Sequence, residues 1–194
     1  MDDAPGDETR ALARQLLLRR FRWSGGHADV WRVFTDGPAL AAVIDGLVAP
    51  WRTSGTTHVA GIESRGFLLG GAAAIALGTG FVAIRKGQGL FPGMKVTATA
   101  AEDYRGQQHL LRMQRSVGPG DRVLLVDDWA ERGSQALAAR QLVEECGATW
   151  LGVSLMVDQL PAAVRLGLHP VTSLVQADEL GDPDAEPVDD GRNL

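Results

Sequence analysis

The feature that most constrains the fold is a short apolar run that ends in two acids. Residues Val123–Val126 read Val-Leu-Leu-Val, and Asp127 and Asp128 follow them directly. So short and branched a run is typical of a strand that is buried on both faces. After a short polar turn, apolar residues recur at helical spacing as far as Gly147, the expected end of a helix. The sequence therefore predicts a strand, an acidic pair, a loop and a helix.

Such a unit can build a ligand site. In open α/β sheets, ligands bind outside the carboxyl ends of the strands, and the amide groups at the start of a helix attract a phosphate. Two carboxylates would repel a phosphate, but they suit hydroxyl groups or a hydrated Mg²⁺. A ligand that carries both a phosphate and neighbouring hydroxyls is a sugar phosphate. The same pattern is equally compatible with a buried strand whose acids only cap the next helix.

A second strand–loop–helix unit precedes the first. His58–Ile62 is predicted to be a strand, and Phe67–Leu77 an apolar helix closed by a glycine. Between them, Arg65 at the start of the helix offers a bidentate anion contact in addition to the backbone donors. A third predicted strand leads to Arg85 and Lys86, and two adjacent cations suit an anionic ligand. Either cation alone is equally compatible with a solvated turn.

Composition narrows the classes of function. A chain of 194 residues fits one domain, here taken as 1–194, and 45% apolar residues indicate a globular protein. The net charge of −5 argues against a nucleic-acid partner. The single Cys146 is predicted to be a core residue, and the four histidines lack the spacing of a zinc site. No apolar segment is long enough for a bilayer, so we expect no membrane partner and a cytoplasmic location.

Two kinds of segment are predicted to lack regular structure. The acidic ends, 1–7 and 181–194, are expected to be disordered. Residues Gly87–Gly106 form a long, small and polar stretch, and so long an irregular segment in a compact domain is usually a lid or is disordered. The segment Phe21–His27 mixes aromatic residues with Gly25 and Gly26, which predicts an exposed connection.

These motifs resemble those of type I phosphoribosyltransferases, most closely the adenine phosphoribosyltransferases. Val59–Gly70 is similar to the pyrophosphate loop of that family, and Arg122–Ala139 resembles its phosphoribosyl pyrophosphate motif. The resemblance runs from about residue 30 to 175, with each motif in the family's order. It implies an α/β fold of three layers, a mainly parallel twisted sheet with helices on both faces, and a flexible hood over 87–110. It also implies a homodimer and a cis peptide between Glu63 and Ser64.

The resemblance implies a role for each motif. The donor phosphoribosyl pyrophosphate would be held by the acidic pair at its ribose and by the following loop at its 5-phosphate, namely Asp127, Asp128, Ala130, Glu131, Arg132, Gly133, Ser134 and Gln135. Its pyrophosphate would be bound by Glu63, Ser64, Arg65, Gly66, Arg85 and Lys86. The base would be bound by Val30, Trp31, Arg32 and Phe67, although Trp31 is equally compatible with a core residue.

The implied catalytic residues are Arg65, Asp127, Asp128 and a hood acid, Glu102, for which Asp103 or Tyr104 are the alternatives. Mg²⁺ would be held through the donor and through water near the acidic pair, without direct side-chain ligands. The chain departs from the family pattern in its phosphate loop, with Arg132, Ser134 and Gln135 in place of Thr, Gly and Thr, and at Gly89, where the family commonly has Lys.

The implied reaction transfers the 5-phosphoribosyl group to a purine base, adenine first, and releases pyrophosphate. Two alternatives stay open at this point. One is a phosphoribosyltransferase that acts on another nucleobase or a base-like acceptor in specialised metabolism. The other is a non-catalytic regulator that senses phosphoribosyl pyrophosphate, although this acidic single domain lacks the basic face that a DNA-binding regulator usually carries.

Overall fold

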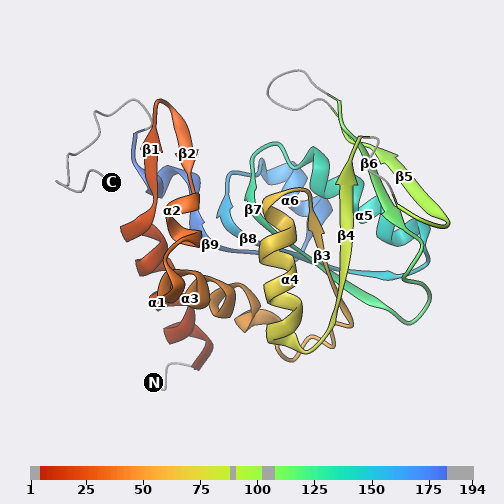
Figure 1. Cartoon of the computed structure of the whole chain (residues 1–194), viewed down its shortest axis with the longest axis horizontal. Coiled ribbons are helices and arrows are strands. Elements are labelled where there is room, and N and C mark those ends of the chain that lie inside the picture. Colours follow the sequence, from red (N-terminus) through yellow and green to blue (C-terminus); the bar gives the residue numbers. More distant parts are fainter. Residues whose placement is uncertain (1–4, 88–90, 102–107, 183–194) are drawn as a thin grey trace.

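The computed structural model describes residues 5–87, 91–101 and 108–182, and a seven-stranded sheet organises them (Figure 1). The order of strands is β5-β6-β4-β3-β7-β8-β9. The five strands from β4 to β9 are parallel, and β6 and β5 extend one edge in antiparallel fashion. The strands are β3 (His58–Ile62), β4 (Gly80–Lys86), β5 (Lys95–Thr99), β6 (Leu110–Gln114), β7 (Arg122–Ala130), β8 (Thr149–Asp158) and β9 (Val171–Gln176). The predicted three-layer α/β fold is confirmed.

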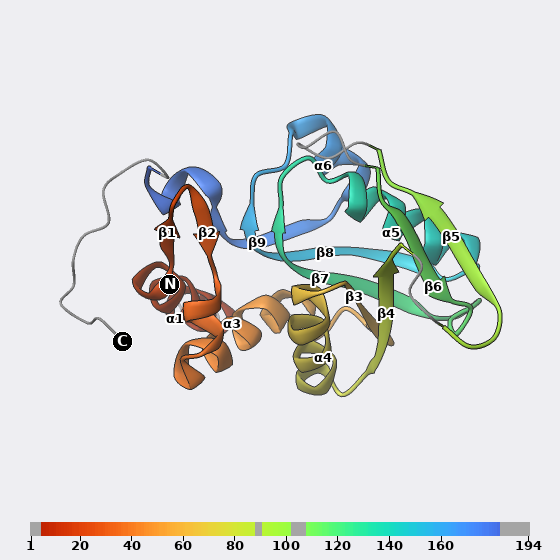
Figure 2. The ribbon, with the colours of Figure 1, turned by 45° about the horizontal axis from the view of Figure 1, so that its top comes forward.

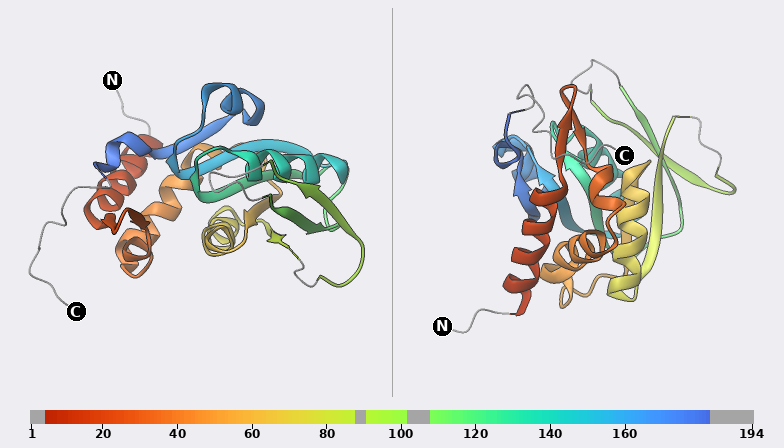
Figure 3. Two further views of the ribbon diagram at one scale, coloured as in Figure 1. Left: turned by 90° about the horizontal axis from the view of Figure 1, so that it is seen from above. Right: turned by 60° about the vertical axis from the view of Figure 1, so that its left-hand side comes forward.

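Helices cover both faces of the sheet, as Figures 2 and 3 show. On one face lie α1 (Pro5–Arg20), α3 (Gly37–Val48) and α4 (Arg65–Leu77), and on the other α5 (Ser134–Glu145) and α6 (Ala162–Leu168). The apolar run of β7 serves both layers: Leu124 and Val126 join the core under α3 and α4, whereas Val123 and Leu125 join the core under α5. This double burial is the reason why the run has no polar alternation.

A small antiparallel hairpin stands beside the sheet, and the sequence did not predict it. Strands β1 (Arg22–Ser24) and β2 (His27–Asp29) pair across Gly25 and Gly26, whose φ angles are 54° and 74°. Two central residues with positive φ give the tight turn that suits a two-residue hairpin. The segment is largely exposed, as predicted, but it is a paired hairpin instead of an irregular connection, and Phe21 is buried and packs against Trp23.

Two of the segments predicted to be irregular are partly regular. Helix α1 begins at Pro5, inside the end that was predicted to be disordered, since a proline suits the first turn and Asp7 and Glu8 favour the helix amino end. Strand β5 lies within the predicted hood, and its alternate residues Val96 and Ala98 are buried. Residues 1–4, 88–90, 102–107 and 183–194 lie outside the described part of the chain. A short helix α2 (Trp31–Phe34) and two single 3₁₀ turns, at Ala49–Trp51 and Ala177–Leu180, complete the described elements.

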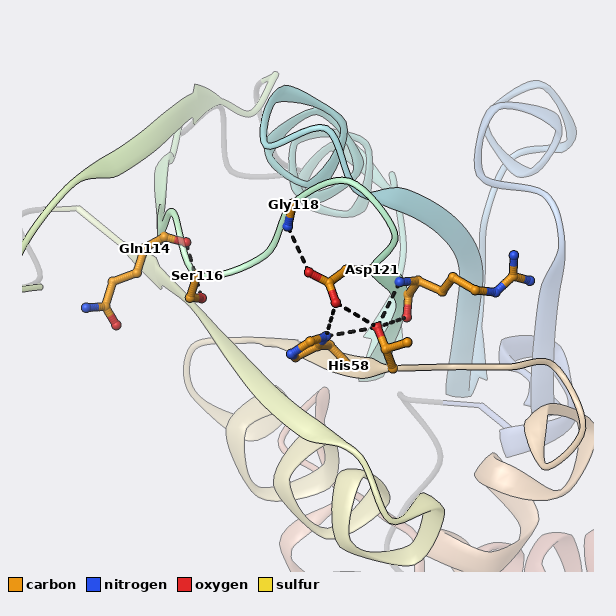
Figure 4. A network of polar contacts seen from close by, with 7 residues as sticks. His58, Gln114, Ser116, Gly118 and Asp121 are labelled. Carbon is orange, nitrogen blue, oxygen red and sulfur yellow. Dashed lines mark hydrogen bonds and ion pairs between the residues drawn. The ribbon is translucent and has the colours of Figure 1, made fainter.

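A polar network ties the amino ends of β3 and β7 together (Figure 4). The Thr57 hydroxyl lies 2.9 Å from His58 Nδ1 and accepts a hydrogen bond from the Arg122 amide at 2.8 Å. Asp121 lies 3.3 Å from His58 Nδ1 and accepts from the Gly118 amide at 2.9 Å. Because the two strands are parallel and fixed at this end, their opposite carboxyl ends lie side by side.

No described helix combines the length and apolar character needed to span a membrane.

Candidate active site

A cavity of about 840 Å³ lies at the carboxyl ends of the parallel strands. The loop after β3 and the loop after β7 both line it, although 66 residues lie between Ser64 and Glu131 along the chain. Its lining includes Ile62, Glu63, Ser64, Arg65, Lys86, His109, Leu125, Asp127, Asp128 and Ala130 to Ala136. It also includes Trp23, His27, Ala28, Trp129, Leu155 and Gln159. The volume is within the range of small-molecule sites in proteins.

Both members of the acidic pair line this cavity. Asp128 is only 5% exposed, and its Oδ2 lies 3.0 Å from Arg65 Nη1. That oxygen accepts no hydrogen bond from any described residue, so the contact is an ion pair without hydrogen-bond geometry. Asp127 Oδ1 accepts from the Asp128 amide at 3.0 Å. A buried carboxylate oxygen without a donor is available for a ligand hydroxyl or a metal-bound water.

The two acids differ in their electrostatic surroundings. Burial, and then the neighbouring charge of Asp128, raises the pKa of Asp127 well above its usual range. Burial also raises the pKa of Asp128, although the Arg65 guanidinium opposes that shift. Two adjacent carboxyls with raised pKa values are typical of a functional site. A bound cation would lower both pKa values by favouring the charged forms.

The loop after β3 is held very close to the acidic pair. A Cβ atom on Gly66 would lie 2.9 Å from Asp127 Oδ1, and a Cβ atom on Gly61 would lie 2.1 Å from the Gly66 carbonyl oxygen. Only glycine permits these two approaches of backbone to backbone and backbone to carboxylate. The peptide between Glu63 and Ser64 is cis, as predicted. Helix α4 begins at Arg65, which places that side chain at the helix amino end.

Glu63 is committed to neighbours on β4. Its carboxylate pairs with Arg85 at 3.2 Å and accepts a hydrogen bond from the Lys86 amide at 3.0 Å. Burial opposes ionisation of Glu63, but the Lys86 amide and the Arg85 guanidinium outweigh it and lower the pKa of Glu63. Lys86 lines the cavity, whereas Arg85 does not. The structure therefore brings Ser64, Arg65 and Lys86 to the cavity and places Arg85 behind Glu63.

The loop after β7 leads into the amino end of a helix. Strand β7 ends at Ala130, one turn of loop follows, and α5 begins at Ser134. Gly133 has a φ of 69°, and a Cβ atom there would lie 2.6 Å from both Leu160 and Val164. The first amide groups of an α-helix have no acceptor within the helix, and Ser134 and Gln135 in the first turn of α5 line the cavity. This arrangement suits a phosphate group.

The residues predicted to bind a base are not in the cavity lining. Val30 is fully buried in the core, and Trp31 is 53% exposed and packs edge-on against Phe34. Arg32 pairs with Asp29, and Phe67 packs against Phe81. The assignment of these residues to the base therefore stays a prediction, and it is the preceding β1–β2 hairpin that reaches the cavity lining. Glu102, with its alternatives Asp103 and Tyr104, lies outside the described residues.

Six further residues that line the cavity were missed in the sequence. They are Trp23, His27 and Ala28 from the hairpin, Trp129 on β7, His109 before β6 and Gln159 after β8. The Gly25–Gly26 pair was a usable signal for a hairpin turn. Nothing local in the sequence links Trp23 with Trp129, whose rings are 6.0 Å apart.

The donor set fits an Mg²⁺ ion held through water. No group of three or more potential metal-ligating side chains occurs in residues 5–87, 91–101 and 108–182. A direct protein cage for a metal is therefore absent from this part of the chain. Two adjacent carboxylates, one with an oxygen that lacks a hydrogen-bond donor, suit the waters of a hydrated Mg²⁺.

The fold and the site define a type I phosphoribosyltransferase. The structure of adenine phosphoribosyltransferase from Rhodothermus marinus superposes with a TM-score of 0.74 at 31% identity, covering 86% of this chain and 99% of that one. The enzyme from Saccharomyces cerevisiae, solved with an imino-altritol bisphosphate and adenine, gives 0.74 at 29% identity, covering 84% and 99%.

Sequence relatives carry the same name, although no protein-family model matches the chain. Adenine phosphoribosyltransferase from Nocardioides sp. is 40% identical over 153 residues, which cover 76% of this chain and 82% of the relative. The enzyme from Maricaulis maris is 40% identical over 154 residues, covering 76% and 85%. The chain belongs to the adenine phosphoribosyltransferase family.

Proposed function

We propose that this chain transfers the 5-phosphoribosyl group of phosphoribosyl pyrophosphate to a purine base, adenine first, and releases pyrophosphate. One observation carries the proposal: the loop with Ser64 and Arg65 and the loop with Asp127 to Gln135 line a single cavity. The 3.0 Å ion pair between Arg65 and Asp128 joins the two loops directly. A donor with a pyrophosphate at one end and a 5-phosphate at the other needs both loops at once.

In the proposed reaction, a ring nitrogen of the base bonds to carbon 1 of the ribose, and the proton of that nitrogen is released to solvent. The bond from that carbon to the pyrophosphate oxygen breaks, so positive charge develops on the sugar and negative charge on the leaving group. Arg65, Lys86 and the amide groups at the start of α4 suit the leaving pyrophosphate, since they are fixed before the reaction. The acidic pair would accept hydrogen bonds from the ribose hydroxyls and favour positive charge on the ring.

Mg²⁺ is the proposed cofactor. Asp127 and Asp128 would hold it through water while the donor supplies further oxygens. When bound, the ion neutralises charge on the pyrophosphate. Asp127 and Asp128 would then be ionised, because a nearby cation offsets the burial that raises the pKa of both groups.

The proposed partners are the donor and a nucleobase, in a cytoplasmic homodimer without nucleic acid or membrane contacts. The net charge of −5 supports the absence of a nucleic-acid partner. Light scattering of the purified chain tests the dimer by its molar mass. The mass of a monomer over the working concentration range would contradict it.

The activity is tested by mixing the chain with phosphoribosyl pyrophosphate, Mg²⁺ and one base at a time, and by measuring the pyrophosphate released. Release with adenine supports the proposal. Release only with another base would support the proposed reaction but contradict adenine as the acceptor. Donor binding by calorimetry, without release on any base, would instead favour the sensing regulator. Chelation of Mg²⁺ with excess EDTA is expected to stop release with any active base.

A further inference from the structure

One end of the cavity has no assigned role in holding the donor. Trp23 and His27 from the hairpin, Trp129 from β7 and Gln159 from the end of β8 line it. These four side chains come from three segments that are remote in the sequence. Two large aromatic groups beside a carboxamide are unsuited to a phosphate, but they suit a flat heterocycle with polar edges.

The aromatic part of this end is held rigidly. Trp23 and Trp129 pack edge to face at 6.0 Å, and Phe21 packs against Trp23 at 5.2 Å. The indole N–H of Trp23 donates to the Leu180 carbonyl at 3.1 Å, which fixes the ring to the chain beyond β9. The indole N–H of Trp129 also has an acceptor, the side chain of Gln159. Neither indole can therefore turn its N–H toward a ligand without losing a hydrogen bond.

The partner of Trp129 is Gln159. Trp129 Nε1 lies 2.9 Å from Gln159 Oε1. An indole N–H can only donate, so the amide atom that faces it must be the oxygen. The backbone amide of Gln159 also donates to the Ala130 carbonyl at 2.9 Å, which fixes the residue next to β7. Because the oxygen is turned toward the indole, the group that Gln159 directs away from Trp129 is its NH₂, which only donates hydrogen bonds.

We propose that Gln159 selects the acceptor by donating its amide N–H to a ring nitrogen or carbonyl oxygen of the heterocycle, and that Trp129 is the positioning residue that orients this amide. The inference rests on the proposed transferase function and names the class of acceptor: a planar nitrogen heterocycle that presents a hydrogen-bond acceptor toward Gln159. A base that presents an amino group at this edge is disfavoured, since two donors would then face each other.

The test compares Gln159→Glu and Gln159→Leu with the wild type, using the acceptor that the panel of bases identifies. Glutamate keeps the oxygen that accepts from Trp129 but replaces the NH₂ with a second acceptor. We expect kcat/KM for the acceptor to fall about 10- to 100-fold in Gln159→Leu and further in Gln159→Glu. The KM for phosphoribosyl pyrophosphate should stay within about twofold, because no assigned donor contact changes.

Gln141→Glu is the matched control, since it adds the same charge at an exposed position of α5 outside the cavity lining. It should behave as the wild type. Wild-type or better acceptor kinetics in Gln159→Glu would overturn the inference and leave the transferase function intact. No pyrophosphate release by the wild type on any base would instead overturn the function on which the inference rests.

Trp129→Phe tests the positioning role, because it removes the indole N–H and keeps an aromatic ring, although a smaller one. We expect a higher KM for the acceptor with little change in kcat. The double variant Trp129→Phe with Gln159→Leu should have the same kcat/KM for the acceptor as Gln159→Leu alone, since the two changes remove the same interaction. Fully additive losses would show that Trp129 acts independently of Gln159 and would refute its positioning role.

Discussion

Replacing Gly61 with alanine should disable the active site from a position that touches no ligand. Gly61 lies on β3, where the strand passes directly beneath the start of α4. A Cβ atom there would lie 2.1 Å from the Gly66 carbonyl oxygen, 2.7 Å from its carbonyl carbon and 3.0 Å from the Phe81 ring. The obstruction is backbone, so no side-chain rotation relieves it.

The size of the effect follows from these distances. Contacts of real Cβ atoms essentially never fall under 3.0 Å, so Gly66 must move by at least about 0.9 Å. The movement carries Arg65 with it and separates that side chain from Asp128. A misplacement of about 1 Å can lower catalytic efficiency about 100-fold. Overpacking of this kind also costs about 1–3 kcal/mol of unfolding free energy.

The assay is kcat/KM for pyrophosphate release, together with urea unfolding monitored by circular dichroism. Gly71→Ala is the matched control on α4, because a Cβ atom there meets nothing within 4 Å. It should leave activity unchanged and raise the unfolding free energy by about 0.5–1 kcal/mol, since alanine favours a helix over glycine. Wild-type activity and stability in Gly61→Ala would refute the close approach on which the reasoning depends.

Three further predictions follow from the same geometry. Asp127→Asn should raise the melting temperature of the ligand-free protein at pH 7, and the gain should vanish below about pH 4. The pKa of Asp127 is raised in the folded protein, so the folded state is favoured while the acid is protonated and loses this stability as the pH rises through the folded pKa. An equal melting temperature of both proteins at pH 7 would contradict this. Asp128→Asn should lower kcat/KM for the donor roughly 100-fold, and unchanged turnover would remove the ribose-holding role. Gly133→Ala should lose about 1–3 kcal/mol in urea unfolding, since its φ is 69° and a Cβ atom would lie 2.6 Å from Leu160; wild-type stability would show that the loop relaxes freely.

The β3 and β7 units could be predicted from sequence because their signals are local. An unbroken apolar run followed by acids specifies a strand that is buried on both faces, and the glycines and caps around it mark the helices. The same signals placed Arg65 and the acidic pair at the carboxyl ends of neighbouring parallel strands. Their convergence on one cavity followed from the general geometry of α/β sheets.

Strand β5 and the hairpin were missed for a physical reason. Strand β5 is short and rich in threonine and alanine, so its alternation is weak until β6 pairs with it. The hairpin is stabilised by Trp129 and by the Leu180 carbonyl, contacts that span more than 100 residues. Stabilisation that comes from contacts between remote residues leaves no pattern in a short stretch of the sequence.

The sequence by itself determined the part of the cavity that we propose for the donor, since its groups follow directly after strands that local apolar runs predict. Only the tertiary structure decided the end of the cavity that we propose for the acceptor. It brought Trp23 and Trp129 together there and set Gln159 against Trp129. The physical reason is that a wall built from three segments exists only once the packing of the whole domain has brought them together.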